Sequence, residues 1–313
     1  MNTAPLPSKP PIFLLGATGC GKSAIAVRLA QLLGKAEIVS ADAYQVYRNI
    51  PILTAAPSPQ ELAAVPHHLI GTLDVTENND AATHARRALR CIDDIRARGA
   101  TPIITGGSGL YVKFISHGIS PAPPSDPALR AELESLPPTE TIRRLQELDP
   151  EGAAATNLLN PRYVIRNLEI VLLSGKPLSY WHSNWEHDPL GPGFHLTREV
   201  DELDRRIAAR AARMLADGAI NEVATLPDKL SLTAEKTLGL SLIRQHLAGT
   251  LSQPELLSAL ALTTRQYAKR QRTWLRREKW AIPIPCTENA AVVIAEQLSR
   301  TSHFPAISYC SGN

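Results

Sequence analysis

Cysteines, aromatic residues and long apolar runs are all scarce in this chain of 313 residues. No apolar run reaches the ~18 residues that cross a bilayer, so no membrane-spanning segment is expected. The proline-rich segment 1–11 lacks the apolar core of a signal peptide, and we expect a short disordered lead-in there. There is no CxxC pair and no histidine at metal-ligand spacing, which predicts reduced thiols in a cytosolic protein at Cys20, Cys91, Cys286 and Cys310.

The chain also lacks a large excess of charge of either sign, and it lacks two signatures of nucleotide hydrolases. The formal net charge is only +3, which does not by itself select a partner. No NKxD motif is present, and the apolar run 102–105 is followed by GGSG, where an ordinary ATPase or GTPase has an aspartate for magnesium. These absences argue against both of those classes. Aromatic residues make up 5%, so the core must consist mainly of Leu, Ile, Val and Ala.

Short apolar runs alternate with segments of helical periodicity along most of the chain. This alternation predicts an α/β fold, in which helices flank a parallel sheet. We expect strands at 12–15, 38–39, 102–105, 194–197 and 281–284. The last of these contains a proline and suits a sheet edge. We expect helices at 22–33, 80–98, 201–216, 252–277 and 288–300.

The composition changes after Gly118, where four prolines follow within ten residues. From there to about Pro192 the pattern is helical and shows no clear strand. We therefore predict an α-helical insertion domain at 117–193, within a core formed by 1–116 and 194–313.

A complete GxxxxGK[ST] motif follows the first predicted strand and precedes the first predicted helix, which is the context its mechanism requires. Its backbone N–H groups, the helix N-terminus and Lys22 favour a diphosphate, and Ser23 is placed to ligate Mg²⁺. Any diphosphate suits such a loop, so the motif alone does not specify a nucleotide. The predicted diphosphate-binding residues are Gly16, Ala17, Thr18, Gly19, Cys20, Gly21, Lys22 and Ser23.

Five further segments accompany the P-loop in order. They are SADAYQVY (40–47), PHHLI (66–70), GGSGLY (106–111), RNLE with SGKP (166–169 and 174–177), and TRQYAKRQ (264–271) followed by Trp274. Each segment alone is weak, but together they resemble the tRNA dimethylallyltransferase family. Three segments differ from that family: LTAAP (53–57) stands for GTAKP, Arg162-Tyr163 for QR, and LGLSL (238–242) for IGYKE. The first and third differences remove a positive charge or an aromatic ring.

The resemblance implies transfer of a dimethylallyl group from dimethylallyl diphosphate to N6 of an adenosine beside a tRNA anticodon. It implies a Mg²⁺ requirement and a P-loop NTPase-like core whose helical insertion grips the anticodon stem-loop. We expect such an enzyme to be cytoplasmic and monomeric.

The adenine N6 amine is a poor nucleophile because its lone pair is delocalised into the ring, so the reaction needs a base. Asp42 is the candidate, because strand ends face the ligand crevice of a parallel sheet; the alternative is a turn or helix cap. Ser108 keeps a hydroxyl where the family has threonine, and would orient Asp42 or the amine. Lys22, Ser23 and Arg210 complete the predicted catalytic set by stabilising the departing pyrophosphate.

Arginines recur along two predicted helices. Arg206 and Arg210 are four residues apart and share a face, and family position favours Arg210 for the pyrophosphate. Between Arg265 and Lys279 there are seven basic residues and one acidic residue. Four of them form one helical stripe suited to RNA phosphates. The predicted tRNA contacts are Asp42, Ala43, Tyr44, Gln45, Ser108, Arg130, Arg162, Tyr163, Arg166, Arg265, Lys269, Arg270, Arg272, Trp274 and Arg276.

Among these contacts, Gln45 has an amide that suits the edge of an adenine extruded from its stack.

Three other functions remain open. A small-molecule kinase would share the P-loop but leave the basic stripe unexplained. An isopentenyltransferase acting on free AMP or ADP would not need a large insertion. A non-enzymatic P-loop RNA binder would tolerate loss of Asp42.

Overall fold

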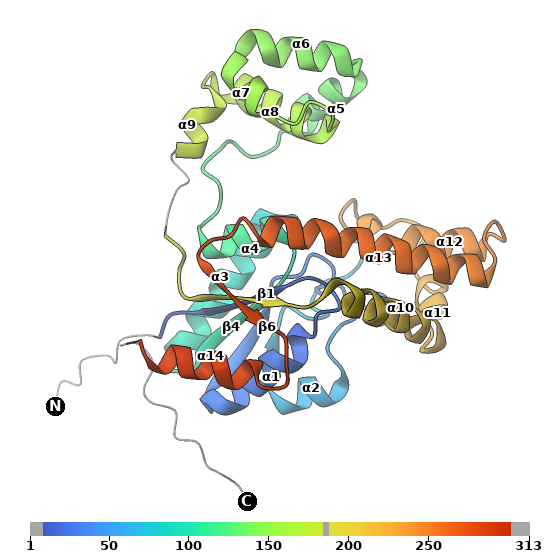
Figure 1. Cartoon of the computed structure of the whole chain (residues 1–313). Coiled ribbons are helices and arrows are strands. Elements are labelled where there is room, and N and C mark those ends of the chain that lie inside the picture. Colours follow the sequence, from blue (N-terminus) through green and yellow to red (C-terminus); the bar gives the residue numbers. More distant parts are fainter. Residues whose placement is uncertain (1–8, 184–187, 302–313) are drawn as a thin grey trace, which may run out of the picture. The chain divides into compact units, whose positions relative to one another are not determined.

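The computed structural model describes residues 9–183 and 188–301, and most of the predicted lead-in therefore lies outside the described residues (Figure 1). The chain divides into a core unit, Met1–Ser116 with Pro189–Asn313, and an inserted unit, His117–Asp188. The second boundary precedes the predicted one by a few residues. The chain has already returned to the core at Leu190, whose backbone N–H donates to the carbonyl of Ser116 at 2.8 Å.

A single six-stranded sheet, in the order β3-β2-β4-β1-β5-β6, forms the centre of the core unit. All of its neighbouring strands are parallel, which confirms the predicted α/β class. Helices cover both faces, so β1 is buried along its whole length. The strands are β1 (Ile12–Gly16), β2 (Ala36–Ser40), β3 (His67–His68), β4 (Thr101–Gly106), β5 (Gly193–Thr197) and β6 (Ala281–Pro285).

The two edge strands differ in how well the sequence predicted them. β6 lies at an edge, as predicted from its prolines. No strand was predicted at His67 and His68, but β3 pairs with β2 there. Two residues are too few to show a strand period. His68 also contacts the carboxylate of Glu37 on β2 at 2.7 Å, so it holds the strand in place.

The helices of the core unit confirm the main predicted segments. The first helix has the predicted bounds, and the third begins after Asp80, whose carboxylate accepts from the Thr83 N–H at 2.7 Å. The helices are α1 (Lys22–Leu33), α2 (Pro59–Ala64), α3 (Ala81–Ala97), α4 (Gly109–Ser116), α10 (Val200–Ala216), α11 (Ala219–Ala224), α12 (Leu240–Leu247), α13 (Gln253–Leu275) and α14 (Ala290–Ser299), with a 3₁₀ turn at Ala234–Lys236.

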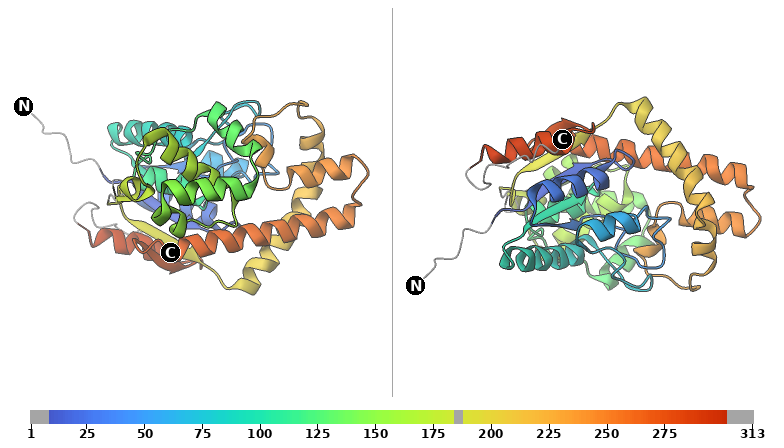
Figure 2. Two further views of the ribbon diagram at one scale, coloured as in Figure 1. Left: turned by 90° about the horizontal axis from the view of Figure 1, so that it is seen from above. Right: turned by 90° about the horizontal axis from the view of Figure 1, so that it is seen from below.

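Two apolar clusters stabilise the core unit. One joins the sheet to α1 and α14, and includes Leu14, Leu29 and Ile294. The other joins α10, α11, α12 and α13 to the segment after β2, and includes Tyr47 and Leu256. Figure 2 shows α11 and α12 beyond one end of the sheet, with the long helix α13 extending back from there over the core. The second cluster therefore fixes α10 and α13 beside the loops that follow the strands.

All regular secondary structure among the described residues of the inserted unit is helical, as predicted. Its helices are α5 (Pro127–Ser135), α6 (Pro138–Leu148), α7 (Pro150–Ala155), α8 (Pro161–Ser174) and α9 (Leu178–Ser183). Leu133, Leu145 and Leu168 are fully buried between them. Across residues 9–183 and 188–301, no helix has the length and apolar character that crossing a membrane requires.

Candidate active site

The loops that follow β1, β2 and β4 meet at the carboxyl edge of the sheet. The turns after β2 and β4 approach closely, because a Cβ on Gly106 would lie 2.7 Å from the carbonyl oxygen of Ala41. Ala43 donates its backbone N–H to the Ser108 hydroxyl at 3.4 Å. Glycine at position 106 therefore lets the segments carrying Asp42 and Ser108 come together.

The P-loop after β1 adopts the conformation expected of an anion cradle. Gly19 and Gly21 have φ angles of 82° and 107°, in the left-handed region that favours glycine. Lys22 begins α1, and its ammonium donates to the Ala17 carbonyl at 3.0 Å. The Ser23 side chain is half-buried, and no side chain or carbonyl among the described residues forms a hydrogen bond with its hydroxyl.

Three arginines from the β5–α10 region contact the P-loop. Arg210 donates to the Thr18 hydroxyl at 2.6 Å, whereas Arg206 and Arg198 donate to the carbonyls of Gly19 and Cys20 at 2.9 and 3.1 Å. Arg206 and Arg210 share a face, as the sequence predicts. The role of Arg198 was missed, and the only signal was a basic residue directly after a predicted strand.

Arg210 and Asp42 lie near enough to influence each other electrostatically. Burial lowers the pKa of the Arg210 guanidinium, and the Asp42 carboxylate acts in the opposite direction by favouring the charged form. Arginine remains protonated at any physiological pH despite this shift. The site therefore places a fixed positive charge beside a carboxylate.

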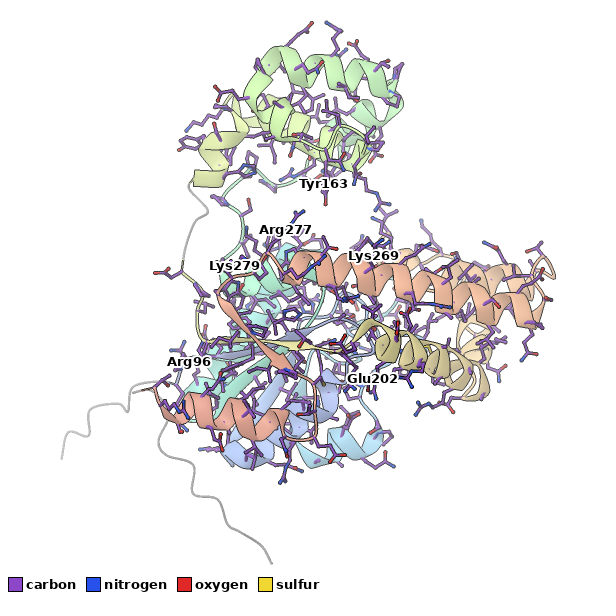
Figure 3. All side chains as sticks on the ribbon, in the orientation of Figure 1. Arg96, Tyr163, Glu202, Lys269, Arg277 and Lys279 are labelled. Carbon is purple, nitrogen blue, oxygen red and sulfur yellow. The ribbon has the colours of Figure 1, made fainter. Side chains whose placement is uncertain are left out.

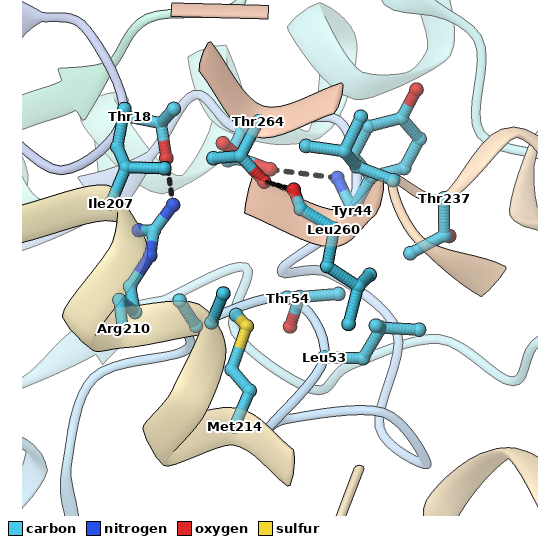
Figure 4. A pocket seen from close by; sticks show the side chains of 14 residues that line it. Thr18, Tyr44, Leu53, Thr54, Ile207, Arg210, Met214, Thr237, Leu260 and Thr264 are labelled. Carbon is cyan, nitrogen blue, oxygen red and sulfur yellow. Dashed lines mark hydrogen bonds between the residues drawn. The ribbon is translucent and has the colours of Figure 1, made fainter. Parts of the chain in front are cut away.

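The Asp42 carboxylate has two contacts within its own turn. Its Oδ1 accepts from the backbone N–H groups of Tyr44 at 2.9 Å and Gln45 at 3.4 Å. The same residue lines a pocket together with Thr18 and Arg210 (Figure 4). Asp42 is thus both a turn cap and a pocket residue, so the two interpretations of its sequence position do not exclude each other.

The pocket has a polar end and an aliphatic wall. Thr18, Asp42 and Arg210 line the polar end, where Figure 4 shows Arg210 bonded to Thr18. Leu53, Thr54, Ala55, Thr237 and Leu238 also line the pocket, so residues from two of the three segments that differ from the family contribute to its lining. The remaining lining residues are Tyr44, Ile207, Ala211, Met214, Leu260 and Thr264.

Ser108 is linked to α13 through Tyr267, a residue that was not among the predicted site residues. Its hydroxyl lies 3.1 Å from the phenol of Tyr267 on α13. Burial raises the pKa of Tyr267, and the charge of Asp42 adds to the increase, so the phenol stays protonated at neutral pH. Tyr267 therefore supplies a hydrogen-bond donor beside Ser108.

Gln45 is held by the protein itself. Its amide oxygen accepts from the Ser40 hydroxyl and its amide nitrogen donates to the Ala55 carbonyl, both at 3.0 Å. Gln45 could bind the edge of an adenine only by giving up its hydrogen bonds to Ser40 and Ala55. Ala43 is buried, and Tyr44 lines the pocket.

The basic stripe lies on α13 and its end. Arg265, Lys269 and Arg276 are exposed, and Arg272 is half-buried. Lys269 projects from the outer side of the helix in Figure 3. Arg270 lies off this line, with its guanidinium 5.7 Å from the centre of the Tyr267 ring.

Trp274 faces inward rather than along the stripe. A Cβ on Gly109 would lie 2.8 Å from the indole, so this ring packs directly against the turn after β4. Its packing accounts for a glycine at position 109.

The predicted tRNA contacts in the inserted unit fall into two groups. Arg130 and Arg166 form ion pairs with the fully buried Glu169 at 2.5 and 2.7 Å, and therefore stabilise that unit internally. Arg162 and Tyr163 are exposed, and Figure 3 labels Tyr163 on the surface of the unit.

Known proteins resemble this chain over most of its length. A family model described as IPP transferase matches residues 45–278. The tRNA dimethylallyltransferase of Akkermansia muciniphila is 57% identical over 276 residues, which cover 88% of this chain and 93% of that protein. The tRNA dimethylallyltransferase of Geobacter sulfurreducens is 40% identical over 287 residues, covering 86% and 90% of the two chains.

Solved structures share the fold. The full-length tRNA isopentenylpyrophosphate transferase from Bacillus halodurans matches with a TM-score of 0.67 and 30% identity, covering 93% of this chain and 96% of its own. A eukaryotic dimethylallyltransferase captured acting on tRNA matches with a TM-score of 0.80 at 24% identity, covering 97% and 82%. The family model and these identities, together with the P-loop and the order of the motifs, show that the chain belongs to the IPP transferase family.

Proposed function

We propose that this protein transfers the dimethylallyl group of dimethylallyl diphosphate to N6 of an adenosine beside the anticodon of tRNA. The observation that supports this proposal best is the pocket at the carboxyl edge of the sheet. Asp42, Arg210 and Thr18 of the P-loop line it together. A diphosphate in the P-loop would therefore end beside a carboxylate able to accept a proton.

In the proposed reaction the adenine N6 attacks C1 of the dimethylallyl group. The new N–C bond forms as the C–O bond to the diphosphate breaks, and pyrophosphate leaves with the bonding electron pair. The Asp42 carboxylate takes the proton that N6 loses. Lys22 and Arg210 stabilise the negative charge that builds on the leaving oxygens.

The half-buried Ser23 hydroxyl, which has no partner among the described residues, fits the predicted Mg²⁺ contact. When bound, Mg²⁺ would neutralise charge on the diphosphate oxygens. The aliphatic wall, which includes Ile207, Met214 and Leu260, suits a short apolar chain.

A target base must leave its stack to reach a carboxylate at the sheet edge, so the proposal includes base flipping. The stripe on α13 would bind RNA phosphates, and the inserted unit would grip the anticodon stem-loop, with Arg162 and Tyr163 as its exposed candidates. We propose that the enzyme is a monomer and that it acts in the cytoplasm, because its tRNA substrate is present there.

One experiment separates the candidate reactions. The protein is incubated with Mg²⁺, dimethylallyl diphosphate labelled in its carbon chain, and either total tRNA or AMP. Label in tRNA alone is the expected result. Label in AMP alone would select the free-nucleotide reaction, and label in neither would overturn the proposal. A parallel incubation with labelled ATP and without RNA tests for a kinase.

Removing two charges from the basic stripe should weaken tRNA binding. The double variant Arg265→Ala with Lys269→Ala is expected to raise the KM for tRNA about tenfold or more, while kcat stays near its wild-type value. The slope of log affinity against log salt concentration should fall by about two, because roughly one counterion is released per phosphate contact. Binding assays at several salt concentrations measure this slope.

The matched control removes two exposed arginines from α3, as Arg86→Ala with Arg90→Ala. Both doubles change the net charge equally. If the two variants alter the slope to the same extent, the effect comes from total charge and the stripe is not the RNA contact.

A further inference from the structure

The inner face of α13 contacts three residues of the turn after β4. Tyr267, Gln271 and Trp274 are spaced by four and three residues, and so lie on one side of the helix. They meet Ser108, Gly107 and Gly109 respectively, and a Cβ on Gly107 would lie 2.7 Å from the Gln271 amide nitrogen. The GGSG turn is thus shaped to receive this helix.

Gln271 reaches beyond that turn to the P-loop. Its amide oxygen accepts from the Thr18 backbone N–H at 2.7 Å, and its side chain is buried with 5% exposed. The Thr18 hydroxyl in turn accepts from Arg210 at 2.6 Å. Thr18 is therefore held by two helices, α13 through its backbone and α10 through its side chain.

The contact also fixes the direction of the peptide group between Ala17 and Thr18. A trans peptide is planar, and its N–H and C=O point in opposite directions. Orienting the Thr18 N–H toward Gln271 therefore orients the Ala17 carbonyl, which accepts from the Lys22 ammonium at 3.0 Å. One buried amide thus sets the environment of both cations proposed to bind the diphosphate.

We propose that Gln271 is a positioning residue for the transfer: through the Ala17–Thr18 peptide it holds Lys22 and Arg210 in the geometry that receives the diphosphate. This inference rests on the proposed function. Gln271 itself need not touch substrate, because its amide oxygen is occupied by Thr18. Catalytic geometry is sensitive to displacements of about 1 Å, which can cost on the order of a hundredfold in rate.

The test compares Gln271→Met, which keeps the side-chain size but removes the acceptor, with Gln266→Met, the same change at an exposed position of α13. Gln271→Met is expected to lower kcat/KM for dimethylallyl diphosphate between about tenfold and a hundredfold. The KM for tRNA should stay within about twofold of wild type. Affinity for inorganic pyrophosphate with Mg²⁺, measured by calorimetry, should fall in parallel with kcat/KM. Gln266→Met should leave all three quantities unchanged.

A purely structural role would lower the thermal midpoint, tRNA affinity and pyrophosphate affinity together, and this result would overturn the proposal. A second measurement needs no variant. Amide hydrogen exchange in the wild-type protein should show strong protection at Thr18, and rapid exchange there would equally overturn it. If the wild type transfers nothing to tRNA, the proposed function fails, whereas the pyrophosphate and exchange measurements still decide the role of Gln271.

Discussion

Asparagine in place of Asp42 should lower the single-turnover rate of transfer to tRNA about a thousandfold. A positioned general base contributes roughly a hundredfold to ten-thousandfold, and the amide cannot accept a proton near neutral pH. Tight binding of both substrates should persist, because the P-loop and the α13 stripe are unchanged. Rapid-quench kinetics with labelled dimethylallyl diphosphate, with tRNA in excess, measure the effect.

Asparagine suits this test because its side-chain oxygen can still accept from the Tyr44 and Gln45 N–H groups that Asp42 binds. The turn after β2 is therefore retained while the basic group is lost. Asp74→Asn is a matched control, since Asp74 makes a similar contact with the Thr76 N–H at 3.0 Å and does not line the pocket. A rate for Asp42→Asn within tenfold of wild type would show that another group accepts the proton.

Methionine in place of Lys22 should lower kcat/KM for dimethylallyl diphosphate by at least a hundredfold. The ammonium lies in the P-loop, within 3.0 Å of the Ala17 carbonyl, where it can move to the diphosphate oxygens. Removing one preorganised electrostatic contact to a developing anion costs about 3 kcal/mol. The KM for tRNA should change little. Steady-state kinetics with each substrate varied in turn separate the two effects.

Lys35→Met removes the same charge from the segment just after α1, and should leave the kinetics near wild type. Calorimetry with inorganic pyrophosphate and Mg²⁺ adds a direct check on the Lys22 variant. Unchanged pyrophosphate affinity in Lys22→Met would mean that the diphosphate lies elsewhere than in the P-loop.

Elements with a long or sharply bounded pattern were predictable from the sequence. The bounds of α1 follow from the P-loop before it and Gly34 after it, and α3 follows from the Asp80 cap. The family resemblance implied the P-loop NTPase-like core, and the related structures share this fold. β3 was not predictable, because two residues show no period and its partner strand lies elsewhere in the chain.

The candidate site was predictable only in part. The sequence placed Lys22, Asp42 and Ser108 after strands, and parallel strands bring such ends to one edge. It did not show that Gln45 is held between Ser40 and Ala55, or that Trp274 turns inward onto Gly109. Both depend on which residues a folded loop or helix faces, and no local pattern encodes this.

The sequence by itself determined the parallel sheet, the P-loop, the helical character of the insertion and the family resemblance. Periodicity and motif spacing are local properties of the chain, so they can be read without coordinates. Only the tertiary structure decided that Arg210 and Gln271 meet at Thr18, residues 192 and 253 positions away from it. Contacts between residues so far apart in the sequence form when the helices pack on the sheet. This packing, and not the spacing of residues along the chain, determines which face of each helix lies toward the P-loop.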